Sequence, residues 1–225
     1  MNVLRKTLNW TTFFVVLTSI YLIFVWVPNE RVMGPVQKIF YYHVSAAWIS
    51  FMAFFVVFIS GVVYLITRNK KWDLIGASSA EIGVLFTTIV LITGPIWARP
   101  VWNTWWTWDA RLTTTLILWF IYLAYLMIRA AINEEEKKER IAAVFGIIGF
   151  IDVPIVWFSI RWWRTIHPVV LDSTGFALSP KMTLTLLISV ISFTLLYILL
   201  LRNLFSLKKA RGELEELKET LRSRN

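Results

Sequence analysis

The chain has 225 residues, of which 57% are hydrophobic, and its mean hydropathy is +0.64. A soluble domain rarely exceeds about half apolar residues, so we expect one membrane domain in a lipid bilayer. The absence of cysteine excludes disulfides, thiolate metal sites and CxxC redox chemistry. A formal charge of +9 would suit a nucleic-acid partner, but in a membrane protein an excess of Lys and Arg reports topology, and no nucleic acid is expected.

Long apolar segments recur along the chain, and each is long enough to cross a bilayer, which takes about 20 residues. Backbone polar groups in lipid must be paired within their own segment, so we predict an all-α polytopic membrane protein. The six predicted transmembrane helices lie near 11–28, 42–67, 76–96, 112–132, 140–160 and 181–203. The first resembles a signal peptide, but it ends in WVPNE without a small-x-small cleavage site, so we expect a retained helix.

The basic residues set the predicted orientation. Sixteen of the 23 Lys and Arg residues fall in the N-terminus, in 68–75, in 129–140 and in the tail from Arg202. Since basic residues collect on the cytoplasmic side, both termini should be cytoplasmic. We therefore divide the chain into a six-helix membrane domain, 1–203, and a cytoplasmic charged C-terminal helix, 204–225.

The tail carries leucines at a spacing that would form a short apolar seam on a helix. These are Leu207, Leu214, Leu217 and Leu221. Two interpretations stay open: a solvated helix resting on the membrane surface, or a docking helix for a cytoplasmic partner.

The chain has only two histidines, and both fall on the predicted outer side. His43 opens the second helix in YYHVSAAW, and His167 follows the fifth helix in RWWRTIHP. A lone histidine is usually a hydrogen-bonded structural residue, so the pair alone is weak support for a site.

Tryptophans give a stronger signal. Five of the 13 lie in WARPVWNTWWTWDARLT, between the third and fourth helices, namely Trp97, Trp102, Trp105, Trp106 and Trp108. An interfacial aromatic belt should populate both faces of the membrane, but 11 of the 13 tryptophans fall in the predicted outer half. Because indole offers a large contact area with few rotamers to fix, we interpret the cluster as a surface for a flat apolar ligand.

Outer arginines complete the pattern. Arg99 and Arg111 flank the tryptophan-rich loop, and Arg161 and Arg164 precede His167. A porphyrin offers an apolar plate, two propionates and an iron with two axial positions, which suit tryptophans, guanidinium groups and two imidazoles respectively. Two histidines hold at most one bis-histidine heme.

Three acidic residues have alternative interpretations. Asp109, within the tryptophan-rich loop, orients a ligand, pairs with Arg111 or caps the fourth helix. Asp152 and Glu81 lie within predicted spans, where ionisable groups are costly and suggest function. Pro154 breaks the helix near Asp152, so that carboxylate has a structural explanation too.

The segments GPIWARPVWNTWWTWDARLT, YYHVSAAW and DVPIVWFSIRWWRTIHP resemble the CcmC family, within the WWD family of heme-handling membrane proteins of cytochrome c maturation. The resemblance covers nearly the whole chain. It implies a bacterial inner-membrane protein that binds heme b on its periplasmic side, with His43 and His167 as axial ligands of the iron. It implies that Trp97, Trp102, Trp105, Trp106, Trp108 and Asp109 form the platform for the porphyrin.

The same resemblance implies delivery of heme to the periplasmic chaperone CcmE, within an ABC-type complex of CcmA, CcmB and CcmD. The chain carries no GxxxxGK[ST] phosphate loop and no GxSxG elbow, so we expect no enzyme, and ATP hydrolysis would belong to a partner. Two alternatives remain. A transporter would need a polar path, for which only Glu81 and Asp152 qualify. A membrane transferase that uses Asp109 with His167 would leave the tryptophans unexplained.

Overall fold

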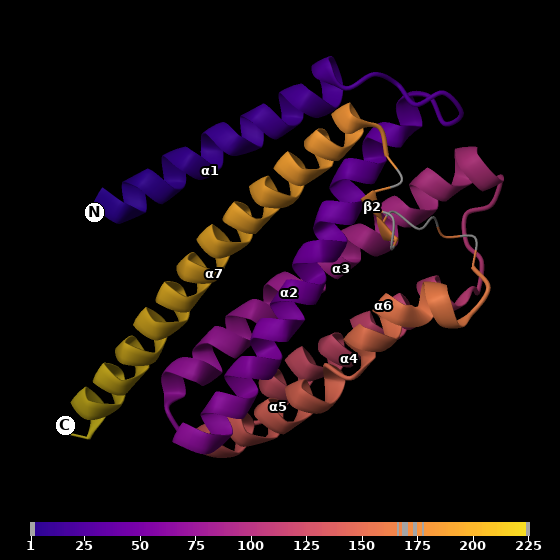
Figure 1. The fold of residues 1–225 in the computed structure, drawn as a ribbon. Helices are drawn as coiled ribbons and strands as arrows, with labels where there is room; N and C mark the ends of the chain where they lie inside the picture. The colour runs from indigo at the N-terminus through magenta and orange to yellow at the C-terminus, as the bar shows by residue number, and fades with distance from the viewer. Residues whose placement is uncertain (1–2, 166, 168–170, 173–174, 177, 224–225) are drawn as a thin grey trace.

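Helices make up most of the structure, a computed structural model that describes residues 3–165, 167, 171–172, 175–176 and 178–223 (Figure 1). In chain order the elements are α1 (Val3–Tyr21), η1 (Leu22–Trp26), η2 (Pro35–Gln37), α2 (Lys38–Thr67), α3 (Lys70–Trp102), α4 (Ala110–Ala131), α5 (Glu135–Gly149), α6 (Asp152–Trp162), β1 (Leu171–Asp172), β2 (Gly175–Phe176) and α7 (Pro180–Arg222). The two short strands form an antiparallel hairpin in which Leu171 pairs with Phe176. The predicted all-α class is confirmed, with this hairpin as a small addition.

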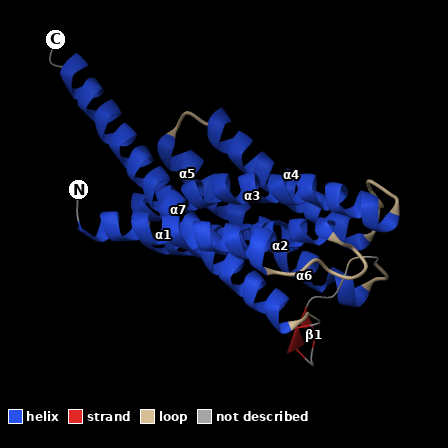
Figure 2. Cartoon of the chain, turned by 90° about the horizontal axis from the view of Figure 1, so that it is seen from above, coloured by secondary structure: helices blue, strands red, loops and turns tan. Residues whose placement is uncertain are grey.

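Six helical segments of the described chain are long and apolar enough to cross a membrane. They correspond one to one with the six predicted spans, and the fifth combines α5 and α6. Both termini lie at the same end of the bundle as the α2–α3 and α4–α5 connections (Figures 1 and 2). We call this the terminal end. The opposite end carries the α3–α4 connection and the hairpin, and we call it the tryptophan-rich end.

The centre of the bundle is built on close aromatic packing between α2, α3 and α4. Phe54 and Tyr122 stack with ring centroids 3.6 Å apart. A Cβ at Gly83 would lie 2.4 Å from Phe54 Cε1, so only glycine lets α3 approach α2 at this level. Membrane helices lack a hydrophobic drive to associate, and small residues at the contact allow the dense packing that holds them together.

The fifth span is broken between Gly149 and Asp152, as the position of Pro154 predicts. Proline has no backbone N–H and therefore cannot donate to the carbonyl of Phe150. That carbonyl accepts from the N–H of Val153 instead, at 3.0 Å. The break lets α6 follow α4 toward the tryptophan-rich end.

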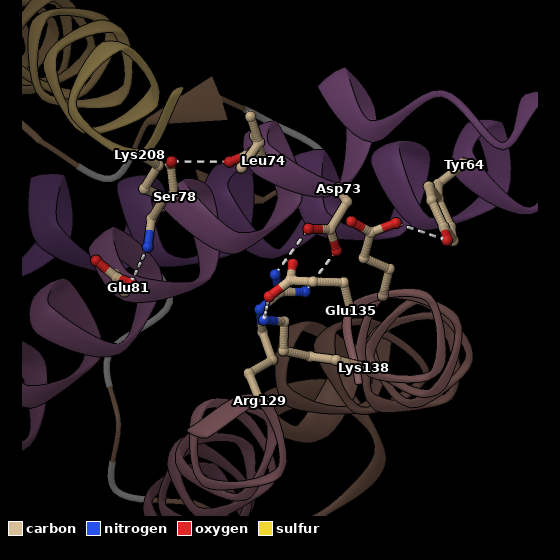
Figure 3. Close-up of polar contacts among 10 residues, drawn as sticks. Tyr64, Asp73, Leu74, Ser78, Glu81, Arg129, Glu135, Lys138 and Lys208 are labelled. Atoms are coloured by element: carbon tan, nitrogen blue, oxygen red, sulfur yellow. Dashed lines mark hydrogen bonds and ion pairs between the residues drawn. The ribbon is translucent and has the colours of Figure 1, made fainter. Parts of the chain in front are cut away.

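Ion pairs tie the helices together at the terminal end (Figure 3). Arg129 of α4 makes two parallel bonds to the carboxylate of Asp73 on α3, at 2.5 and 2.7 Å. Glu81 of α3 accepts from Lys208 of α7 at 2.6 Å, so this carboxylate has a structural role at the terminal end. Both pairs include α3, which anchors α4 and the extended α7.

Several predicted boundaries were too short. The third helix extends from Lys70 to Trp102, through Pro95 and Pro100, so that much of the predicted tryptophan-rich loop is helical. Transmembrane helices tolerate proline because neighbouring groups satisfy the freed carbonyls. The last helix runs unbroken from Pro180 to Arg222, which joins the sixth span to the charged tail. The four tail leucines are exposed on it.

Candidate functional site

A cavity of about 350 Å³ opens near the tryptophan-rich end and is lined by residues from almost every span. Its walls come from α2, α3, α4, α6 and α7, and both histidines contribute to them. Pockets for small molecules usually measure about 300–1,000 Å³ and are mostly apolar with a few polar groups. The lining includes apolar residues as deep as Leu118 and Val90, so the site extends further between the helices than the sequence indicated.

His43 lies on the second turn of α2, where a tight turn sets the start of the helix. The carboxylate of Glu30 accepts from the N–H groups of Val32 and Met33, at 2.7 and 2.6 Å. Gly34 takes a positive φ of 59°, and Pro35 then opens the helical turns. This geometry places His43 in the wall of the cavity, with 7% of its surface exposed.

A hydrogen bond links the ring of His43 on α2 to Thr93 on α3. Nδ1 lies 2.9 Å from Thr93 Oγ1, and the same hydroxyl donates to the carbonyl of Ile89 at 2.7 Å. A threonine hydroxyl has one hydrogen, and when that hydrogen goes to Ile89 O, the oxygen accepts from His43 Nδ1–H. In that arrangement the neutral imidazole has its lone pair on Nε2, which is the tautomer that binds a metal through Nε2.

His167 lies between the end of α6 and β1, and its ring lies near that of His43. The two ring centroids are 6.4 Å apart, and the ring planes differ by 35°. Two imidazoles that bind one metal ion from opposite sides, each with a bond of about 2 Å, place their centroids roughly 6 Å apart. The observed spacing therefore suits a single ion between two imidazoles.

The predicted tryptophans divide into two groups. Trp97, Trp102 and Trp106 line the cavity, and Trp97 is only 3% exposed. Trp105 and Trp108 lie outside its lining and are 58% and 75% exposed. Their predicted contact with the ligand therefore stays a prediction.

Polar atoms in the cavity wall remain available for a ligand. Trp97 Nε1, Trp106 Nε1 and Thr107 Oγ1 are buried and have no hydrogen-bond partner among the described residues. Leaving such donors unpaired is costly, so these atoms suit a ligand that accepts hydrogen bonds. Sequence patterns gave no indication of Thr107.

The four predicted arginines have different surroundings. Arg111 lines the cavity, and its Nη1 donates to the carbonyls of Val156 and Trp157 at 2.8 and 3.3 Å, which links α4 to α6. Arg161 also lines the cavity. Arg99 lies outside the lining and binds Asn103 O and Oδ1, both at 2.7 Å, at the C-terminus of α3.

The fourth arginine, Arg164, is exposed and outside the cavity lining. Asp109 caps α4, as one of its three interpretations predicts: its Oδ1 accepts from the N–H of Leu112 at 3.0 Å. Asp109 Oδ2 accepts from Thr165 at 3.0 Å, a contact that the sequence did not predict. Asp152 is buried and does not line the cavity.

Comparisons with known proteins agree over most of the chain. The family model described as "Heme exporter protein C" matches residues 1–219. A heme exporter protein C of Bradyrhizobium diazoefficiens is 37% identical over 175 residues, which cover 77% of this chain and 66% of that protein. The heme exporter protein C of Escherichia coli K12 is 34% identical over 190 residues, 82% of this chain and 76% of that protein.

A mitochondrial relative shows similar agreement. A cytochrome c biosynthesis ccmC-like mitochondrial protein of Marchantia polymorpha is 38% identical over 182 residues. The matched region covers 80% of this chain and 77% of that protein.

Proposed function

This chain belongs to the heme exporter protein C family, and we propose that it binds heme between His43 and His167 and delivers it to a chaperone outside the membrane. In this proposal the protein lies in the bacterial inner membrane. Its tryptophan-rich end faces the periplasm, and its terminal end faces the cytoplasm. The bound heme is heme b, and it is cargo to be transferred rather than a resident cofactor.

The observation that carries the proposal is the spacing of the two histidine rings. Their centroids are 6.4 Å apart across one cavity, which matches two imidazoles on one iron. Thr93 supports the assignment, because a hydroxyl that donates to Ile89 O and accepts from His43 Nδ1–H leaves Nε2 as the ligand atom. Imidazole is a common axial ligand of heme iron.

The remaining walls suit the other parts of a porphyrin. The indoles of Trp97, Trp102 and Trp106 offer flat apolar contact, and the unpaired Nε1–H groups of Trp97 and Trp106 can donate to propionates. Arg111 and Arg161 contribute positive charge at the cavity wall. Only Nη1 of Arg111 is used by hydrogen bonds in the described structure, and a guanidinium carries five N–H donors, so several of its donors can still reach a carboxylate.

The protein acts in this proposal as a platform for transfer, not as an enzyme. The chain has no phosphate-binding loop, so ATP hydrolysis falls to a partner. By family membership we propose that CcmE accepts the heme, and that CcmA, CcmB and CcmD form the membrane complex.

The test is a visible spectrum of the detergent-purified protein from heme-sufficient cells. The variants His43→Ala and His167→Ala are compared with Arg31→Ala, a control at an exposed position on the same end of the bundle. We expect a Soret band with sharp low-spin bands in the wild type and in the control, and loss of the low-spin form in both histidine variants. Unchanged low-spin spectra in either histidine variant would overturn the ligand assignment.

A further inference from the structure

One hydroxyl joins the backbone of His167 to the N-terminus of α4. Thr165 Oγ1 lies 3.0 Å from Asp109 Oδ2 and 3.0 Å from the backbone nitrogen of His167. An amide N–H can only donate, and an ionised carboxylate can only accept. The hydroxyl must therefore accept from His167 and donate to Asp109, and its single hydrogen is fully used.

Asp109 is itself fixed by its role as a helix cap. Its second oxygen, Oδ1, accepts from the N–H of Leu112, and its main chain begins α4. The Thr165 contact spans 56 residues of sequence, so it is not part of a local turn. Through this contact, a rigid transmembrane helix sets the position of a residue that lies outside any helix.

The backbones of His43 and His167 lie in different surroundings. His43 lies within α2, whose helical backbone determines where its ring points. His167 lies beyond Trp162, the last residue of α6, and outside any helix. A ligand residue must be held to within about 0.5 Å for a productive geometry, which requires support from surrounding groups.

We propose that Thr165 is a positioning residue for His167, and that Asp109 acts on the heme iron through it. This inference rests on the proposed function, since it assigns Thr165 a role toward an axial ligand. Asp109 thereby has two tasks, to cap α4 and to hold the hydroxyl that orders His167. Neither task requires Asp109 to touch the heme.

The first test uses the heme-free protein and measures hydrogen exchange in the segment 163–167. Thr165→Val removes both hydrogen bonds at nearly constant volume, and Thr165→Ser keeps the hydroxyl. Thr114→Val is the matched control, because that hydroxyl binds only carbonyls of its own helix, α4. We expect exchange to accelerate on the order of fivefold to tenfold in Thr165→Val alone, as expected for one lost hydrogen bond. Equal exchange in the valine and serine variants would overturn the proposal.

The second test titrates the same three variants with hemin and records the visible spectrum. We expect Thr165→Val to bind heme about 10–100-fold more weakly, the usual effect of losing a group that orients a metal ligand, and to gain a high-spin component that imidazole removes. Thr165→Ser and Thr114→Val should match the wild type. A normal spectrum and affinity in Thr165→Val would refute a positioning role.

The two tests separate failure of this inference from failure of the proposed function. If the wild type binds no heme, the proposed function fails, and the axial role of Thr165 fails with it. The exchange measurement would still show whether the hydroxyl orders His167. If the wild type binds low-spin heme and Thr165→Val does so equally well, only the positioning role is lost.

Discussion

Replacement of Thr93 by valine tests the proton assignment on His43. The hydroxyl accepts from Nδ1–H across 2.9 Å at a histidine with 7% of its surface exposed. Valine has nearly the same shape but no acceptor. The Nδ1–H group then loses its partner in a buried site, at a cost of about 1–3 kcal/mol. Alternatively the proton moves to Nε2, which blocks the nitrogen that we assign to iron.

Both consequences of Thr93→Val weaken heme binding, by roughly 10–100-fold if the effect is typical of groups that orient metal ligands. The assay is a titration of the heme-free protein with hemin in detergent, followed at the Soret band. Thr93→Ser should bind like the wild type. So should Thr18→Val, whose hydroxyl donates only to Phe14 O within α1. Binding by Thr93→Val within twofold of the wild type, with an unchanged low-spin spectrum, would refute the assignment.

Two further predictions concern folding and the cavity wall. Asp73→Asn should lower the free energy of unfolding by about 3–5 kcal/mol, because it removes the buried carboxylate that pairs with the partly buried guanidinium of Arg129. Adding Arg129→Met should recover much of this loss, and thermal unfolding in detergent measures both. If the double variant is no more stable than Asp73→Asn, the loss does not come from the unpaired charge of Arg129. Trp97→Ala should reduce heme affinity and also destabilise the protein by about 3–5 kcal/mol, whereas Trp108→Ala, at a residue 75% exposed, should leave the unfolding temperature unchanged. Equal unfolding temperatures for the two tryptophan variants would contradict this.

Hydropathy predicted the number of spans because each lipid-facing segment must satisfy its own backbone. It could not predict where the helices end, since the limits depend on contacts outside the lipid. The helix α3 continues through Pro95 and Pro100 until Asn103 adopts a left-handed conformation, and Arg99 binds the carbonyl there. The charged tail continues α7, and Lys208 in it forms a salt bridge with Glu81 on α3. The Lys208–Glu81 contact spans 127 residues and follows no periodic pattern.

The sequence also predicted which residue types gather at one end, but not their directions. His43 and His167 were placed on one face, and the structure brings their rings to 6.4 Å. Arg99 looked equivalent to Arg111 in the sequence, yet only Arg111 lines the cavity. Thr93 and Thr165 had no sequence signal. Their hydrogen bonds join residues that are 50 and 56 positions apart in the sequence. In an apolar sequence, such a threonine looks the same as one whose hydroxyl donates to a carbonyl of its own helix.

The two histidines are held by unequal means, and this has a consequence for release of the heme. His43 lies within α2 and contacts Thr93, whereas His167 lies outside any helix and its backbone N–H donates to the Thr165 hydroxyl. Because His167 is not held by a helical backbone as His43 is, we predict that the bond from iron to His167 breaks first when another ligand competes. Carbon monoxide added to the reduced heme complex should therefore give a spectrum like that of His167→Ala with carbon monoxide, in which His43 is still bound. A spectrum that matches the His43→Ala complex instead would mean that helix α2 releases its ligand first, and that the order of release follows something other than the anchoring seen here.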